Sequence, residues 1–490
     1  MSAIELESDT YDVVIIGTGL AESIAAAALA KVGKTVLHLD PNEYYGGSQA
    51  SLTLDELVAW SNKTTPSYSK ASTSALTPQL ETDRRRYSLS LFPTILPSRG
   101  SLISTLISSD VSKYVSFRIL DSVGLWDEES GTVRKVPGSK EEVFKDKSIS
   151  LLDKRRLMKF LLFTAGEFEN DQSLQGKESL PLLDFLRDTF QIPSVLASSI
   201  IYSIAHSSSA SEPTLPALLR TRRYLKSLGR YGNSAFLVGQ FGGAGELAQG
   251  FCRACAVHGG TYVLGPSSIP ESISVDSDYN IQMKLPCHPR PVNARHLIAS
   301  PRHLAPSLTH PSSEQTTTTT TAHCIALLPS LPETLHAPRE EADSIDAAVI
   351  VFPPSGEDGN VVRGLLMGEG TGSCPSGQFI LYLSKTVSPD DPTLSPEAIL
   401  SPYLAKLSTE PLFQSYHFAH RMSSSPVSPS KGIIVLDPYH GTEQLTEGLD
   451  WESEQGEKAF WGVMGDRESL GEGKGYFVKA EEEDEPDDDL

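Results

Sequence analysis

The hydrophobic pattern of the first 47 residues predicts a strand, a helix and a second strand. An apolar run over residues 11–17 precedes an alanine-rich stretch over 20–32, a Gly33-Lys34 turn and another apolar run over 35–40. Short apolar runs that end at glycine are typical of buried strands, and the stretch between them has the length of a helix. We therefore expect a βαβ unit at the start of a parallel sheet.

A different pattern, with helical periodicity, occupies residues 139–229. Ser150 begins a segment in which apolar residues recur at Leu157, Phe160 and Leu161, the spacing of one helix face. Three more helical segments follow, and Gly229 ends the last of them, where a left-handed cap suits glycine. We expect a small all-α domain here.

After residue 230 the strand-helix alternation resumes. A strand over 235–238, a helix over 246–257 and a strand over 261–264 follow one another, and buried strands are expected at 347–354 and 378–384. The predicted fold class is therefore α/β: a doubly wound, FAD/NAD(P)-binding type of large domain. Its two parts, residues 1–138 and 230–470, flank the inserted helical domain at 139–229.

Three segments have the composition of loops. Residues 61–82 are rich in serine and threonine and suggest a surface loop. Residues 286–345 combine prolines, histidines and a threonine run, and we expect a poorly ordered, low-complexity insertion without chemistry of its own. Residues 471–490 end in EEEDEPDDDL and are expected to form a disordered acidic tail.

Charge and composition exclude several classes of partner. The net charge of −21 opposes binding to nucleic acid. Five scattered cysteines and an acidic start without an apolar signal core favour the cytosol, with the nucleus left open. No apolar run approaches the roughly 20 residues that span a bilayer. Contact with membranes is therefore expected to be indirect and transient.

The strongest local motif is the glycine loop between the first strand and the first helix. Gly17, Gly19 and the acidic Asp40, 23 residues after Gly17, fit a dinucleotide-binding pattern, but Glu22 stands at the third glycine position. A carboxylate about 5 Å from a pyrophosphate would cost roughly 3 kcal/mol per charge pair at an effective dielectric near 20. We therefore expect the fold without a bound cofactor, and a structural cap at Asp40.

Two other groups of residues have alternative interpretations. Cys252, Cys255 and His258 share helical spacing, but three ligands without a fourth favour buried thiols over a metal site. Arginines and lysines at 220, 222, 223, 226 and 230 form either a solvated helix face or a docking surface for an acidic partner. No catalytic triad, paired carboxylates in a recognisable frame or Gly-Lys-Ser/Thr phosphate loop is present, so no catalytic residues are expected.

The stretch from YDVVIIGTGLAESI to the YYGG turn at 44–47 resembles the Rab escort protein and Rab GDP-dissociation inhibitor family. RRRYSLSLFPTILPSRG, DKRRLMKFLLF, LGRYGNSAFL and GELAQGFCRACAVHGGTYVLG resemble further segments of that family, in the family's order. The resemblance covers roughly residues 10–270 and, more thinly, the strands to about 410. It implies a flavoprotein-like fold without catalytic flavin, and it explains the acidic residue at position 22.

The resemblance also implies partners and site residues. Tyr45, Glu246 and Arg253 match positions of a platform that contacts GDP-bound Rab GTPases. For each of them the alternative is an intramolecular pair that fixes the platform loop. The helical domain would shelter the geranylgeranyl lipid of Rab. The residues proposed to line this prenyl-lipid pocket, with packing in the helical core as the alternative, are Met158, Leu161, Leu162, Ile200, Ile201 and Ile204.

Within the family, the long loops, the acidic tail and the GEGTGSCPSG segment favour the escort branch, which serves the Rab geranylgeranyltransferase heterodimer without bond chemistry of its own. A recycling inhibitor of the same family is the close alternative. A flavin-dependent oxidase is the distant one, since it requires a working glycine loop.

Overall fold

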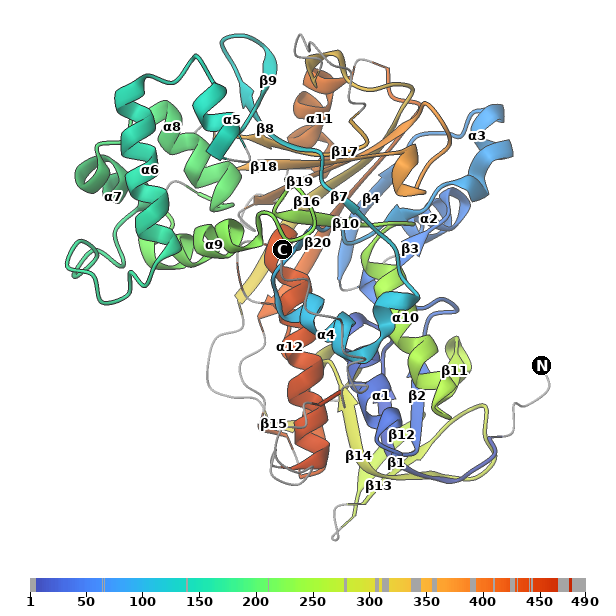
Figure 1. Cartoon of the computed structure of the whole chain (residues 1–490). Coiled ribbons are helices and arrows are strands. Elements are labelled where there is room, and N and C mark those ends of the chain that lie inside the picture. The colour runs from blue at the N-terminus through green and yellow to red at the C-terminus, as the bar shows by residue number, and fades with distance from the viewer. Residues whose placement is uncertain are drawn as a thin grey trace, which may run out of the picture.

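The computed structural model describes residues 6–465 together with Tyr476 and Phe477, apart from residues 64, 66, 138–139, 210, 277–279, 305–307, 311–316, 336–344, 355–358, 388–393, 409, 424–427, 430, 440 and 442–443. Two large sheets, three small sheets of two or three strands and a set of helices make up this part of the chain (Figure 1).

The first sheet is built on the predicted βαβ unit. β1 (Thr10–Ile16) pairs in parallel with β2 (Val36–Asp40) on one side and with β14 (Val292–Ala299) on the other. β11 (Thr261–Leu264) extends the sheet beyond β2, and β22 (Ile433–Val435) pairs in parallel with β14. Two strands complete it on the β14 side by antiparallel pairing: β13 (Ile281–Lys284) and β12 (Ser272–Val275).

Helix α1 (Leu20–Lys31) is enclosed by protein along nearly its whole length. It packs against α10 (Ala244–Val257) and α12 (Gln444–Met464), which lie on either side of it (Figure 1). A helix that is apolar all round can be stable only when it is buried, and the four consecutive alanines 25–28 let its neighbours approach closely. This packing holds the glycine loop at residues 17–19 rigidly in place.

The second sheet has eight mostly antiparallel strands. Their order is β4 (Tyr68–Thr73), β20 (Phe413–Ser423), β16 (Thr317–Leu328), β19 (Phe379–Val387), β18 (Val362–Gly368), β17 (Ala347–Phe352), β8 (Ser122–Asp127) and β9 (Thr132–Lys135). Among the strand pairs of this sheet in the described residues, β17–β8 is the one parallel pair.

Two of the loop predictions are wrong. Residues 61–82 contain the edge strand β4 and helix α3 (Pro78–Asp83). The threonine run lies in β16, which pairs along its length with β19 and β20. Threonine is β-branched and favours strands. The two partner strands pair with the backbone of the threonine run, and this pairing does not depend on the polarity of the side chains. Residues 286–345 also hold β14, while 305–307, 311–316 and 336–344 lie outside the described residues.

The helical region contains α5 (Lys140–Lys145), α6 (Leu151–Ala165), α7 (Leu182–Phe190), α8 (Ser194–Ser198), a π-helical turn (Ser199–Ile204) and α9 (Thr214–Ser227). As predicted, Ser150 caps α6 by accepting the Asp153 N–H at 3.2 Å, and Gly229 has a φ of 82°. The helices stand at one side of the eight-stranded sheet (Figure 1).

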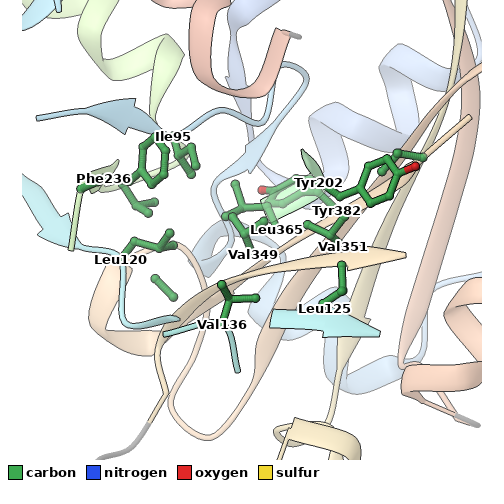
Figure 2. Packing of buried hydrophobic residues seen from close by; sticks show 14 of the residues in the cluster. Ile95, Leu120, Leu125, Val136, Tyr202, Phe236, Val349, Val351, Leu365 and Tyr382 are labelled. Atoms are coloured by element: carbon green, nitrogen blue, oxygen red, sulfur yellow. The ribbon is translucent and has the colours of Figure 1, made fainter. Parts of the chain in front are cut away.

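The core of the helical region continues into the second sheet. Tyr202 packs with Tyr382, Leu365 and Val349 of that sheet, and Phe236 joins the same cluster (Figure 2). A shared apolar core of this kind fixes the helices against the sheet. The boundaries 139 and 229 remain predictions.

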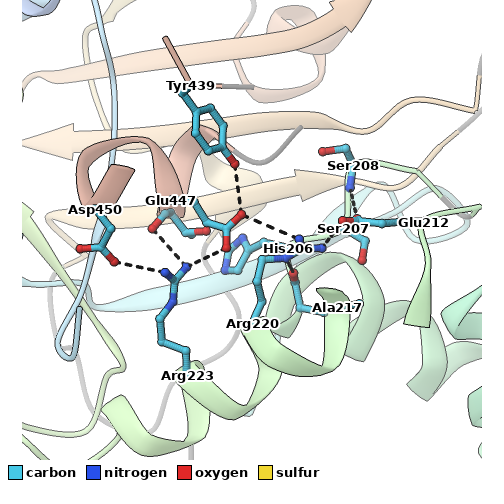
Figure 3. Close-up of polar contacts among 12 residues, drawn as sticks. His206, Ser207, Ser208, Glu212, Ala217, Arg220, Arg223, Tyr439, Glu447 and Asp450 are labelled. Atoms are coloured by element: carbon cyan, nitrogen blue, oxygen red, sulfur yellow. Dashed lines mark hydrogen bonds and ion pairs between the residues drawn. The ribbon is translucent and has the colours of Figure 1, made fainter. Parts of the chain in front are cut away.

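The arginines of α9 do not form a solvated face or a docking surface, because each makes an ion pair within the chain, whereas Lys226 of the same helix is exposed. Arg220 is 8% exposed and forms an ion pair with Glu212, and Arg223 Nη1 lies 3.1 Å from Asp450 Oδ2 of α12 (Figure 3). Glu447 forms ion pairs with both arginines and accepts a hydrogen bond from the Tyr439 hydroxyl. These contacts connect the helical region to α12, and hence to the first sheet.

Of the expected acidic tail, the structure describes Tyr476 and Phe477. Both are buried: Phe477 packs against Phe251 of α10, and Tyr476 packs against Phe460 of α12. The disorder expected for 471–490 is wrong at these two positions, because their aromatic rings are buried. The acidic residues 481–490 lie outside the described residues.

Candidate functional site

The chain's own side chains fill the glycine loop. A Cβ placed on Gly19 would lie 2.6 Å from Glu22 Oε2, and one on Gly17 would lie 3.2 Å from Glu22 Oε1. The Leu20 N–H, at the start of α1, donates to Gln49 Oε1 at 2.7 Å. In a dinucleotide-binding loop these positions face the pyrophosphate. Protein oxygens therefore occupy the phosphate position.

Burial and neighbouring groups determine the state of Glu22. Desolvation raises its pKa, while the positive charge of Arg302 and a hydrogen bond from Ser300 Oγ, at 2.9 Å, act in the opposite direction. Glu452 of α12 interacts electrostatically with the same carboxyl, and burial followed by the charge of Glu22 raises the pKa of Glu452 to about 7. One buried and one half-buried acid thus lie close to each other near the loop.

Asp40 has a structural role at the end of β2. Its carboxylate accepts the N–H and the hydroxyl of Thr18, at 2.7 and 2.6 Å, and the N–H and side-chain amide of Asn42, at 2.8 and 2.9 Å. Four donors already use the acceptor capacity that a ribose hydroxyl would need. Asp40 acts as a cap that joins the glycine loop to the following turn.

A surface groove of about 290 Å³ brings Tyr45, Glu246 and Arg253 together, although they are distant in sequence. Tyr45 comes from the turn after β2, and the other two come from α10. Gly46, with a φ of 94°, makes the turn possible, and a Cβ on Gly245 would lie 2.5 Å from the Ser51 backbone nitrogen. Glycine at both positions lets α10 approach the turn closely.

The polar residues of the groove differ in exposure. Arg253 is exposed, and its guanidinium lies 4.7 Å from the centre of the Tyr114 ring. Burial raises the pKa of Glu246 and of Tyr45. In the part of the chain that the structure describes, neither Glu246 nor Arg253 forms an ion pair, but Glu246 accepts from Gln249 and Arg253 stacks on Tyr114. The Rab contact and the intramolecular alternative both stay predictions.

Of the lining residues that the sequence did not reveal, two contact the charged residues of the groove. Gln249 lies one helical turn from Glu246 and donates to its Oε1 at 3.2 Å, so helix periodicity alone could have identified it. Tyr114 comes from the segment after α4 (Ser101–Ser109), 130 residues before the start of α10, and no local motif marks it.

A second, apolar groove of about 920 Å³ opens among the helices. Five of the six residues expected in a lipid pocket line it: Met158, Leu161, Leu162, Ile200 and Ile204. Ile201 is the exception: it does not line the groove and packs in the core of the helical region. Leu162 and Val195 are 63% and 58% exposed. A groove with such an apolar mouth suits a long hydrocarbon chain.

Comparisons of fold give the class of protein. The structure of Rab GDI from Plasmodium falciparum has a TM-score of 0.68 and 20% identity, covering 93% of this chain and 98% of that one. Putrescine oxidase has a TM-score of 0.51 and 12% identity, covering 93% and 99%. The predicted flavoprotein-like α/β fold is thereby confirmed.

Sequence comparisons give the family. The profile described as GDP dissociation inhibitor matches residues 7–400, so the chain belongs to this family. It is 32% identical to Rab proteins geranylgeranyltransferase component A of Saccharomyces cerevisiae, over 77% of this chain and 62% of that protein. The protein of the same name from Drosophila melanogaster is 31% identical over 88% of this chain and 84% of its own length.

No helix within the described ranges combines the length and the apolar character needed to cross a membrane.

Proposed function

We propose that the chain is a Rab escort protein: it binds GDP-bound Rab GTPases, presents them to the Rab geranylgeranyltransferase heterodimer and shelters the attached lipid in the cytosol. The observation that carries the proposal is the groove in which Tyr45, Glu246 and Arg253 meet. Arg253 can bond bidentately to a carboxylate or carbonyl, and the tyrosines bury area with little loss of rotamer entropy.

The apolar groove among the helices supports the lipid-sheltering part of the proposal. Each methylene of a prenyl chain that leaves water contributes about 0.8 kcal/mol. Five predicted lining residues already surround a space of suitable size. The chain itself would supply no bond chemistry, and the transferase would carry out the reaction.

Relatives named as components of the transferase support the escort role over recycling. The experiment combines purified chain, transferase, unprenylated Rab and geranylgeranyl diphosphate. We expect the chain to stimulate lipid transfer at substoichiometric amounts. If the chain does not stimulate lipid transfer but extracts already prenylated Rab from membranes, it acts as the recycling inhibitor instead.

The oxidase alternative has a separate test. A flavin absorption spectrum that survives dialysis of the purified chain would overturn the proposal. The carboxylate of Glu22 over Gly17 and Gly19 argues against such binding.

A further inference from the structure

A large apolar side chain stands exposed beside the α10 groove, which Tyr45, Glu246 and Arg253 line. Phe241 is 49% exposed and lies in the loop between β10 (Phe236–Gly239) and α10, five residues before Glu246. It lines neither this groove nor the apolar groove among the helices. Single exposed apolar residues are common on protein surfaces, so the backbone that holds this ring is what sets it apart.

The backbone at Phe241 has a conformation that side chains rarely adopt. Its φ is 52°, and the two glycines that follow, Gly242 and Gly243, have φ values of 89° and 79°. Positive φ suits glycine but is unfavourable for a bulky residue such as phenylalanine. Strained residues of this kind persist only where surrounding contacts hold them, and they cluster at functional sites.

Two other segments hold the Phe241 loop by hydrogen bonds. The Phe241 N–H donates to the Thr371 carbonyl oxygen at 3.0 Å, and the Phe241 carbonyl oxygen accepts from the Ser88 hydroxyl at 2.7 Å. The Gly242 N–H donates to Ser373 Oγ at 3.2 Å. The backbone on both sides of the ring is therefore fixed, although its conformation is unfavourable.

The ring of Phe241 lies against Gly372, which belongs to the glycine-rich segment between β18 and β19. A Cβ on Gly372 would lie 2.6 Å from ring atom Cε1, so any larger residue there would displace the ring. Gly372 has a φ of 67°, which also favours glycine. The glycine-rich segment thus supports one part of the ring and leaves the rest exposed.

The loop that carries Phe241 is continuous with the α10 groove. The N–H of the preceding residue, Gln240, donates to the Ser116 carbonyl oxygen at 3.0 Å. Ser116 comes two residues after Tyr114, which lines the groove, and Glu246 of the groove lies in the first turn of α10. Phe241 therefore lies beside the end of the groove at which α10 begins.

The α10 groove alone is too small for a stable protein complex. Its volume is about 290 Å³, whereas a stable interface buries about 800 Å² on each partner. Charged groups such as those of Glu246 and Arg253 contribute mainly specificity, and buried aromatic residues are enriched among those that supply affinity. A partner that occupies the groove must therefore extend beyond it, and Phe241 offers an apolar contact there.

We infer that Phe241 is an apolar anchor of the Rab-binding surface and inserts into an apolar depression on the GDP-bound Rab that occupies the groove. This inference rests on the proposed function. The hydrogen-bonded loop and the contact with Gly372 hold the ring in place before the partner arrives. Little conformational entropy is therefore lost on binding.

The test measures the Tm of each full-length variant and its Kd for fluorescently labelled, unprenylated Rab loaded with GDP. Phe241→Gly removes the ring and suits the positive φ. We expect it to weaken binding at least fivefold, with a Tm close to that of the wild type, because relief of backbone strain offsets the lost packing of the ring. Phe241→Tyr keeps the ring and should bind within about twofold of the wild type.

Leu180→Ala is the matched control, because Leu180 is 44% exposed and lies in the helical region, away from the loop. It should leave the Kd unchanged. If the wild type binds no Rab, the proposed function and this inference both fail. If the wild type binds Rab and Phe241→Gly binds equally well, the inference alone is wrong.

Two further outcomes would contradict the inference by giving the ring another role. If Phe241→Gly keeps its affinity for Rab but loses binding to vesicles of anionic phospholipid, the ring contacts a membrane surface. If the Tm falls together with the affinity in Phe241→Gly, and Leu180→Ala keeps both, the ring serves the stability of the fold.

Discussion

At the scale of single residues, Arg253 is the most direct test of the proposed Rab surface. Its guanidinium stacks on Tyr114 and forms no ion pair in the described part of the chain. We expect Arg253→Ala to weaken binding of GDP-bound Rab by about 1 to 3 kcal/mol, the range for a hydrogen bond to a charged group. Titration of fluorescently labelled Rab measures the change in Kd.

The ring beneath Arg253 provides a graded comparison. Tyr114→Phe keeps the stacking surface and should bind almost normally, whereas Tyr114→Ala should weaken binding by less than Arg253→Ala does. Arg85→Ala is the matched control for loss of an exposed charge. An unchanged Kd for Arg253→Ala in a folded protein would remove Arg253 from the interface.

Glu452 predicts how the free energy of unfolding depends on pH. Burial and the charge of Glu22 raise its pKa from 4.5 to about 7. The folded state therefore holds this proton more tightly than the unfolded state. The bound proton's contribution to the free energy of unfolding is fully present below about pH 4.5 and is lost as the pH rises through about 7. Glu452→Gln should be more stable than the wild type at pH 8 by about 1 to 3 kcal/mol.

Urea unfolding of both proteins at pH 5 and pH 8 checks this difference. The variant's relative stability should increase between the two pH values. Glu454→Gln, an exposed change on the same helix, is the control and should show no such trend. A constant difference between Glu452→Gln and the wild type would show that Glu452 does not titrate in this range.

The sequence predicted the glycine loop and the surface residues better than it predicted their surroundings. The spacing of Gly17, Gly19 and Asp40 indicated the turn, and Glu22 indicated that a phosphate would be disfavoured. The orientation of the Glu22 carboxyl depends on Ser300, 278 residues away. The contact between Arg253 and Tyr114 is also long-range, so no local pattern could reveal it.

At the scale of elements, the contact between α9 and α12 holds the helical region to the rest of the molecule (Figure 3). Arg223→Ala would leave the Asp450 side chain, which is 10% exposed, without its cation. We expect a loss of about 2 to 4 kcal/mol in the free energy of unfolding, because an unpaired buried charge is costly. Chemical denaturation measures it.

The control for this change is another arginine of the helical region. Arg187 is 60% exposed and pairs with Asp184 and Asp188 on the surface. Arg187→Ala should cost less than about 1 kcal/mol, as exposed ion pairs usually do. Equal losses for the two variants would contradict a special role for the α9–α12 contact.

Elements with strong local periodicity were predicted well, and strands with polar composition were not. The region of α6 follows from its apolar spacing and the Ser150 cap, and the regions of α1 and α10 follow from helix-length stretches between two strands. β4 and β16 were mistaken for loops because their serines and threonines resemble linker composition. Each is a strand because β20 pairs with it, and β20 lies about 90 residues or more further along the chain.

At the scale of the whole molecule, the two grooves lie on different parts of the surface, with α10 and α6 well separated (Figure 1). They can therefore be disabled independently. Leu161→Asp places a charge in the apolar groove, and we expect it to weaken binding of geranylgeranylated Rab at least tenfold. Binding of unprenylated Rab should stay unchanged, because the α10 groove is intact.

Leu151→Asp is the matched control, since Leu151 lies on the same helix, is 77% exposed and does not line the groove. It should leave both affinities unchanged. Equal weakening of prenylated and unprenylated Rab by Leu161→Asp would show a general loss of structure instead of a lost lipid site.

The carboxylate that covers Gly17 and Gly19 has a consequence for how the chain matures in a cell. Proteins that keep this fold around a bound vitamin derivative gain stability from that ligand, so their abundance can follow its supply. Here Glu22 and Gln49 occupy the phosphate position from the moment the chain folds. We therefore expect cells starved of riboflavin to accumulate this protein at normal levels. Immunoblotting of this protein, with a flavin-binding enzyme as the reference for comparison, would test this.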